Sequence, residues 1–155
     1  MIGRVLIMLF TYLQGGYLIQ ETTIVKVNVK ETLVHIDVTG LVAIEVDVKE
    51  GYHIQANKLD DESLVPTTLE VNNTESVTIN KQEFPPSKQF QLEGTDSFLY
   101  VYDGKFLIKL FLTPVEKVGK HNLLAKLKYQ ACDAKSCLFP RVVSFSIPIE
   151  IESKN

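Results

Sequence analysis

The sequence has no tryptophan, and only two cysteines, three histidines and two methionines occur among its 155 residues. It also lacks any dense block of lysine or arginine, and its formal net charge is −3. Nucleic-acid binding depends on concentrated positive charge, so the sequence does not support a nucleic-acid partner. Two cysteines are also too few for a small disulfide-framework protein or for a four-ligand zinc site.

Metal binding is weakly supported by the residues that are present. A mononuclear copper site would pair one cysteine with histidines and a methionine, but neither residue type follows Cys137. The acidic loop at 60–62 can supply calcium ligands, yet solvated loop carboxylates are far commoner. We therefore predict no metal and no cofactor. The histidines and methionines are scattered over His35, His53, His121, Met1 and Met8.

The first sixteen residues differ in composition from the rest of the chain. Arg4 precedes an uncharged apolar run, residues 5–13, which is followed by Gln14-Gly15-Gly16. This order is typical of a secretory signal peptide, so we expect residues 1–16 to direct export. The run is too short to span a bilayer, which needs about 20 apolar residues, and the alternative is a first buried strand. Export would place the two thiols in an oxidising compartment.

From residue 17 onwards the chain alternates apolar and polar residues with a period of two. The alternation is clear in residues 41–48, 105–112, 121–131 and 142–151, and Asp103-Gly104 is the strongest tight-turn dipeptide. No helical stripe is sustained over three turns. Seven to nine short strands separated by turn signals predict an all-β fold, an immunoglobulin-like antiparallel β-sandwich formed by a single domain over residues 17–155.

The two cysteines lie close together, in the connection between the strand expected to end at Ala131 and the last strand. Four residues separate Cys132 from Cys137. A disulfide between them encloses so little chain that it constrains the unfolded state by roughly 2 kcal/mol, less than a long bridge would. Chemistry therefore explains the pair better than bracing does. We expect the bridge to be exposed at a loop tip, where a partner thiolate can reach it.

These residues resemble the N-terminal periplasmic domain of the thiol:disulfide interchange protein DsbD family. The segment from Tyr129 to Pro140 carries most of the similarity because it contains both cysteines. Weaker matches extend the resemblance over residues 45–151. They are Gly51-Tyr52-His53-Ile54-Gln55-Ala56-Asn57, Leu64-Val65-Pro66-Thr67, Phe84-Pro85-Pro86 and Tyr102-Asp103-Gly104-Lys105.

The resemblance implies a role for each cysteine. It makes Cys137 the thiol that attacks or receives a partner disulfide, and Cys132 the resolving thiol. It also implies a cap loop that covers the cysteines, with Tyr102 as the covering aromatic; the alternative for Tyr102 is an ordinary half-buried residue at a strand end. Tyr129 and Gln130 are candidates for orienting the cysteine loop, although a plain strand role explains them equally well.

The resemblance also implies partners. The expected electron donor is a thioredoxin-like protein or domain, and the expected acceptors are oxidised periplasmic proteins. The sequence continues into neither a membrane domain nor a thioredoxin-like domain, so we expect a relay domain of the thiol:disulfide oxidoreductase type that is not self-sufficient. A membrane redox protein would then be a separate chain. The alternative function is a secreted immunoglobulin-like binding or adhesion module with a purely structural hairpin disulfide.

Overall fold

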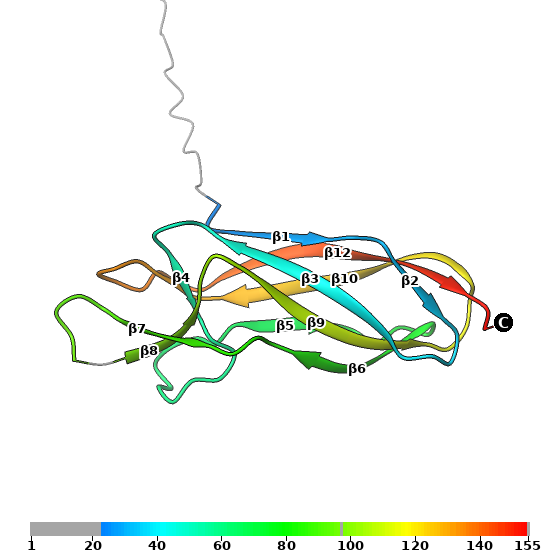
Figure 1. Ribbon diagram of the computed structural model, residues 1–155, viewed down its shortest axis with the longest axis horizontal. Helices are drawn as coiled ribbons and strands as arrows, with labels where there is room; N and C mark the ends of the chain where they lie inside the picture. The colour runs from blue at the N-terminus through cyan, green and yellow to red at the C-terminus, as the bar shows by residue number, and fades with distance from the viewer. Residues whose placement is uncertain (1–22, 97, 155) are drawn as a thin grey trace, which may run out of the picture.

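The computed structural model describes residues 23–96 and 98–154, and the predicted signal peptide at 1–16 lies outside this part of the chain. The described residues form strands and connecting loops, and they contain no helix long and apolar enough to cross a membrane. The strands, drawn in Figure 1, are β1 Val25–Val29, β2 Thr32–His35, β3 Gly40–Val48, β4 His53–Gln55, β5 Thr68–Val71, β6 Val77–Glu83, β7 Lys88–Gln91, β8 Phe98–Tyr102, β9 Lys105–Pro114, β10 Gly119–Tyr129, β11 Ala131–Cys132 and β12 Arg141–Glu152.

The strands form three four-stranded sheets. The first has the order β1-β3-β9-β6, the second β2-β12-β10-β5 and the third β11-β4-β8-β7. All pairs are antiparallel except β12 with β2, which are parallel. The first two sheets form the body of an immunoglobulin-like fold, which confirms the predicted fold class. The third sheet lies at one end of this body (Figure 1).

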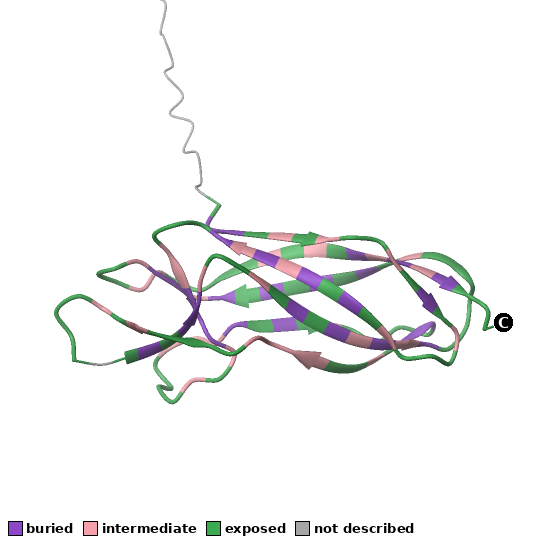
Figure 2. Ribbon diagram, viewed as in Figure 1, coloured by how far each residue is buried: buried purple, intermediate pink, exposed green. Residues whose placement is uncertain are grey.

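The period-two alternation of the sequence directs one face of each long strand into the core. In β3 the side chains of Val42, Ile44 and Val46 are buried, while their neighbours face outward. The same alternation runs along β9, β10 and β12 and produces the purple and green banding of Figure 2. Alternating strands of this kind cover one face with apolar side chains, and two such faces bury each other.

The third sheet is reached through the predicted Asp103-Gly104 turn. This turn joins β8 to β9, and Gly104 has a φ of 57°, which a glycine adopts without steric cost. Strands β8 and β9 belong to different sheets, so the turn moves the chain from the end sheet into the body and does not close a hairpin. The carbonyl of Gly104 accepts a hydrogen bond from the Val48 N–H at 2.9 Å, which anchors the turn to the first sheet.

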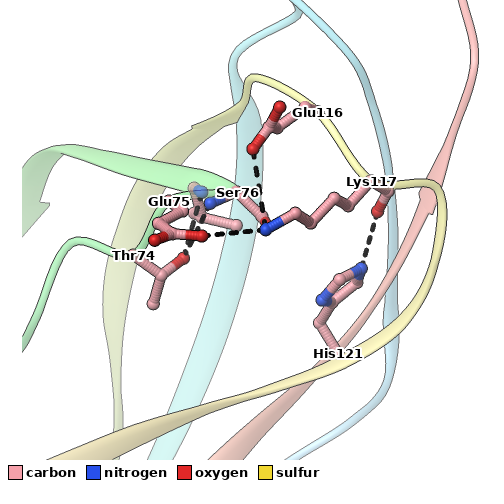
Figure 3. A network of polar contacts seen from close by, with 7 residues as sticks. Thr74, Glu75, Ser76, Glu116, Lys117 and His121 are labelled. Atoms are coloured by element: carbon pink, nitrogen blue, oxygen red, sulfur yellow. Dashed lines mark hydrogen bonds and ion pairs between the residues drawn. The ribbon is translucent and has the colours of Figure 1, made fainter.

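At the opposite end of the body, the β5–β6 and β9–β10 turns are held together by polar contacts (Figure 3). The Lys117 ammonium lies 2.9 Å from the Glu75 carboxylate and 3.7 Å from that of Glu116, and the His121 ring contacts the Lys117 carbonyl at 2.6 Å. The hydrogen bond from Lys117 is the main reason that the pKa of Glu75 lies below its ordinary value. These groups are exposed, so the network stabilises the fold only slightly.

Two details of the sequence-based prediction are wrong. The described residues form twelve strands where seven to nine were expected, and two short ones, β7 and β11, formed no part of the predicted pattern. The strand predicted to run to Ala131 ends at Tyr129 because the chain leaves the β10–β12 ladder at Gln130. There the Gln130 carbonyl accepts the N–H of Gln55, and the next residues pair with β4.

Candidate functional site

Cys132 and Cys137 form a disulfide across a short hairpin at the end of the molecule that carries the third sheet. The N–H of Asp133 donates to the carbonyl of Ser136 at 2.9 Å, which closes the turn between the cysteines. The Asp133 carboxylate accepts the backbone N–H groups of Lys135 and Ser136, each at 2.8 Å. These two bonds, that from Lys135 first, lower the pKa of Asp133 below its ordinary value. The carboxylate is thus engaged with its own turn.

The two sulfurs have different surroundings. Cys132 is fully buried, at 0% exposure, whereas Cys137 is only partly buried. A surface pocket of about 340 Å³ is lined by Cys137 together with Gln130, Leu138, Phe139 and Arg141. The expectation of a bridge exposed at a loop tip is therefore wrong for Cys132, because strand β11 pairs this residue with His53 of β4. Only the Cys137 side of the bond borders on solvent.

An apolar cluster surrounds the buried sulfur. Cys132 packs in it with Leu99 and Val101 of β8, and partly buried side chains of Leu64, Phe90, Leu92 and Cys137 pack against them. The ring of Phe90 also stacks on His53, with a centroid distance of 3.9 Å. The N–H of Glu93 donates to the carbonyl of Ala134 at 2.9 Å. The β7–β8 hairpin therefore packs beside the disulfide and is bonded to the cysteine turn.

Gln55 is a site residue that the sequence reasoning missed. Its side chain is fully buried, and its Nε2 lies 3.1 Å from the Cys132 Sγ and 3.8 Å from the Cys137 Sγ. Its Oε1 is buried without a hydrogen-bond partner among the described residues. The sequence held one signal of a buried polar side chain: Gln55 lies between the apolar residues Ile54 and Ala56 in a short strand. Nothing local indicated that Gln55 would face cysteines far along the chain.

Tyr102 does not belong to the cluster around Cys132. It is buried in the main core, where its ring lies 4.9 Å from that of Phe106 and 6.3 Å from that of Phe84. Its hydroxyl donates to the Oδ1 of Asn57 at 2.5 Å. Burial is the main reason that the pKa of Tyr102 is raised. These contacts are those of a core tyrosine.

The other two predicted residues lie at the start of the cysteine loop. Tyr129 is buried in the main core, and burial is the main reason that its pKa is raised. The Gln130 side chain accepts the N–H of Val65 at 2.7 Å through Oε1 and donates to the carbonyl of Leu138 at 3.1 Å through Nε2. Gln130 therefore bonds the 57–67 loop to the loop that follows Cys137.

Metal ligands are not grouped in the part of the chain that the structure describes: it contains no cluster of three or more His, Cys, Asp or Glu side chains suited to holding an ion. The disulfide and the groups packed around it are therefore the candidate site.

Three comparisons place this fold among known proteins. No curated protein matches the chain. The N-terminal periplasmic domain of ScsB from Proteus mirabilis superposes with a TM-score of 0.51 and 17% identity over 81% of this chain and 45% of that one. This chain thus spans less than half of the ScsB chain. Two further structures superpose less well. The reduced DsbD N-terminal domain of Neisseria meningitidis has a TM-score of 0.42 and 15% identity over 68% of this chain and 74% of that one. A cohesin module of Clostridium perfringens has a TM-score of 0.46 and 12% identity over 84% of this chain and 100% of that one.

The family comparison is more specific than the structural ones. Residues 20–148 match the family described as "Thiol:disulfide interchange protein DsbD, N-terminal", and this match covers most of the chain. The match includes both cysteines, the β4 strand beneath them and the β7–β8 hairpin beside them. The chain therefore belongs to the family of the DsbD N-terminal domain.

Proposed function

We propose that the Cys132–Cys137 pair is redox-active and relays reducing equivalents to oxidised protein partners in the periplasm. The observation that carries this proposal is the unequal burial of the two sulfurs. Cys132 is enclosed at 0% exposure, while Cys137 borders a surface pocket. Thiol–disulfide exchange needs one sulfur that a partner can approach and one that is kept for the resolving step.

The reaction follows from this inequality. In the reduced domain the Cys137 thiolate attacks a sulfur of the partner disulfide, which forms a mixed disulfide and releases one partner thiolate. The Cys132 thiolate then attacks the Cys137 Sγ, which re-forms the internal bond and releases the second partner thiolate. Two electrons pass to the partner, which ends as a dithiol, and this domain ends as the disulfide. Reversal of the same steps with a dithiol donor reduces the domain again.

The β7–β8 hairpin supplies the cover for this pair. Phe90 and Leu92 pack against the cluster that contains Cys132, and the Glu93 N–H is bonded to the cysteine turn. Displacement of this cover would expose the Cys132 side of the bond to a partner docked at Cys137. Tyr102, the aromatic first expected in this role, packs in the main core instead. Gln130 fits a loop-orienting role because its amide bonds two loops that flank the site, and Tyr129 packs in the core beside it.

The partners follow from the reaction and from the family. A thioredoxin-like protein or domain is the proposed electron donor, and oxidised periplasmic proteins are the proposed acceptors. A membrane redox protein can feed the donor. Arg141 and Phe139, which is 91% exposed, lie beside Cys137 and supply a basic and an apolar contact for either partner.

Trapping in the periplasm tests the proposal. In Cys132→Ala the mixed disulfide on Cys137 cannot be resolved, so partner proteins should remain attached and be recovered under non-reducing conditions. Cys137→Ala is the matched control and should capture far less, because its remaining thiol is buried. Capture by neither variant would contradict the relay.

The reduction potential separates the relay from the alternative of a binding module with a structural disulfide. A structural bond resists reduction, with a potential below about −300 mV, whereas an exchange domain titrates nearer the potentials of its partners. Equilibration of the whole chain with glutathione redox buffers, read by thiol alkylation, measures this potential. A potential below about −300 mV would contradict the relay and support the binding module.

A further inference from the structure

The side chain that contacts both sulfurs comes from β4, the strand that pairs with β11 in the third sheet. Gln55 lies on β4, its amide nitrogen lies 3.1 Å from the Cys132 Sγ and 3.8 Å from the Cys137 Sγ, and it is fully buried. Its backbone is fixed on both sides: its N–H donates to the Gln130 carbonyl at 2.9 Å, and its carbonyl accepts the Thr67 hydroxyl at 2.5 Å. The amide is therefore held against the disulfide by the fold.

In the oxidised state the Gln55 amide has poor hydrogen-bond partners. A disulfide sulfur is a weak acceptor and has no proton to give, so the Gln55 Oε1 is left buried without a partner among the described residues. An unpaired buried acceptor is destabilising, and such groups in folded proteins call for an explanation. The reduced pair offers what the amide lacks, since a thiol S–H can donate to Oε1 and a thiolate can accept from Nε2.

The Cys132 sulfur needs a hydrogen-bond donor when it becomes a thiolate. When a partner thiolate attacks Cys137, the S–S bond breaks and its electron pair stays on the Cys132 sulfur. The neighbours of Cys132 in its cluster are apolar side chains, and such surroundings disfavour a thiolate. An amide N–H directed at the same sulfur opposes this effect, because hydrogen bonds to a charged acceptor are stronger than those to a neutral one.

We propose that Gln55 is a positioning residue of the exchange reaction, whose amide N–H stabilises the Cys132 thiolate as it forms and whose Oε1 accepts the S–H of the reduced pair. The proposal rests on the redox role proposed for the two cysteines. Gln55 would then stabilise the reduced pair relative to the disulfide and lower the barrier to breaking the S–S bond.

Gln55→Met tests the proposal because methionine has similar length and lacks both amide atoms. Loss of one hydrogen bond to a charged group predicts an approximately tenfold slower reduction of the disulfide by dithiothreitol. The equilibrium should also move approximately tenfold toward the disulfide, which lowers the potential by about 30 mV. Gln82→Met on β6, in the first sheet, is the matched control and should leave both values unchanged.

A second measurement distinguishes positioning from simple packing. In a Cys137→Ala background the single Cys132 thiol is titrated by thiolate absorbance, and Gln55→Met should raise its pKa. Gln55→Glu keeps the shape but carries a charge near neutral pH, so it should slow reduction more strongly as the pH rises. A folded Gln55→Met with the wild-type reduction rate, potential and Cys132 pKa would overturn the proposal.

The two proposals fail separately. A wild-type potential below the structural limit removes the relay whatever Gln55 does, and the Cys132 titration still tests the amide contact because it needs no partner.

Discussion

The replacement of Phe90 by alanine tests whether the β7–β8 hairpin limits access to the disulfide. Phe90 is partly buried, its ring stacks on His53 at a centroid distance of 3.9 Å, and it packs against the cluster that contains Cys132. Strand β7 lies at the edge of its sheet, where β8 is its one partner among the strands that the structure describes. Removal of the ring therefore takes away a principal apolar contact between this hairpin and the site.

The expected magnitude follows from the burial of the ring. A fully buried phenylalanine contributes about 3–5 kcal/mol relative to alanine, so a partly buried one contributes about half of that, or about 2 kcal/mol. If attack on the disulfide requires the hairpin to open, removal of the Phe90 ring raises both the population of the open hairpin and the reduction rate. A change of about 2 kcal/mol corresponds to an approximately 30-fold faster reduction.

The assay is the rate of disulfide reduction by dithiothreitol under native conditions, followed through the appearance of free thiols. Phe84→Ala is the matched control, because Phe84 is also partly buried but packs on the main core beside Tyr102. It should lower the free energy of unfolding and leave the reduction rate near the wild-type value. The reasoning is refuted if Phe90→Ala is reduced at the wild-type rate, or if both variants accelerate the reaction equally.

Two further predictions concern the neighbourhood of the site. Tyr102→Phe removes the hydroxyl that donates to Asn57 and should lower the free energy of unfolding, measured by urea denaturation, by about 1 kcal/mol, with no change in reduction rate; faster reduction would restore Tyr102 as a cover. The pKa of Asp133 is lowered chiefly by the Lys135 N–H, so the carboxylate contributes stability above its unfolded pKa of about 4, and this is lost as the pH falls through its lower folded value. Asp133→Asn should therefore flatten the acid-side decline in the free energy of unfolding, and an unchanged slope would contradict this assignment.

The parts of the fold that were predictable are those set by local pattern. Strand β3 follows the alternation predicted for residues 41–48 to within one residue, and the Asp103-Gly104 turn lies where the dipeptide predicted it. The position of the cysteines between the last two long strands was also predictable, because β10 and β12 pair directly across them. Each of these features depends on residues close together in the chain.

The features that were missed depend on pairing between distant segments. Gln55 and Cys132 are 77 residues apart, and they meet because β11 leaves the β10–β12 ladder and adds to β4. A two-residue strand has no periodicity to detect, so the burial of Cys132 had no local signal. The placement of Tyr102 was missed for a related reason: its turn lies at a junction between sheets, and only the sheet pairing decides which core receives the ring.

The short span of the disulfide helps to explain how one fold can serve both oxidation states. A ring of this size contributes only about 2 kcal/mol through the unfolded state, so its reduction leaves most of the stability in place. The backbone bonds that close the turn, from Asp133 N–H to Ser136 and from Leu138 N–H to Ala131, do not depend on the S–S bond. The two sulfurs should therefore remain adjacent after reduction, one enclosed and one at the surface. Reduction would then alter the contacts of Gln55 and the cover while the main core stays intact, as the proposed relay requires.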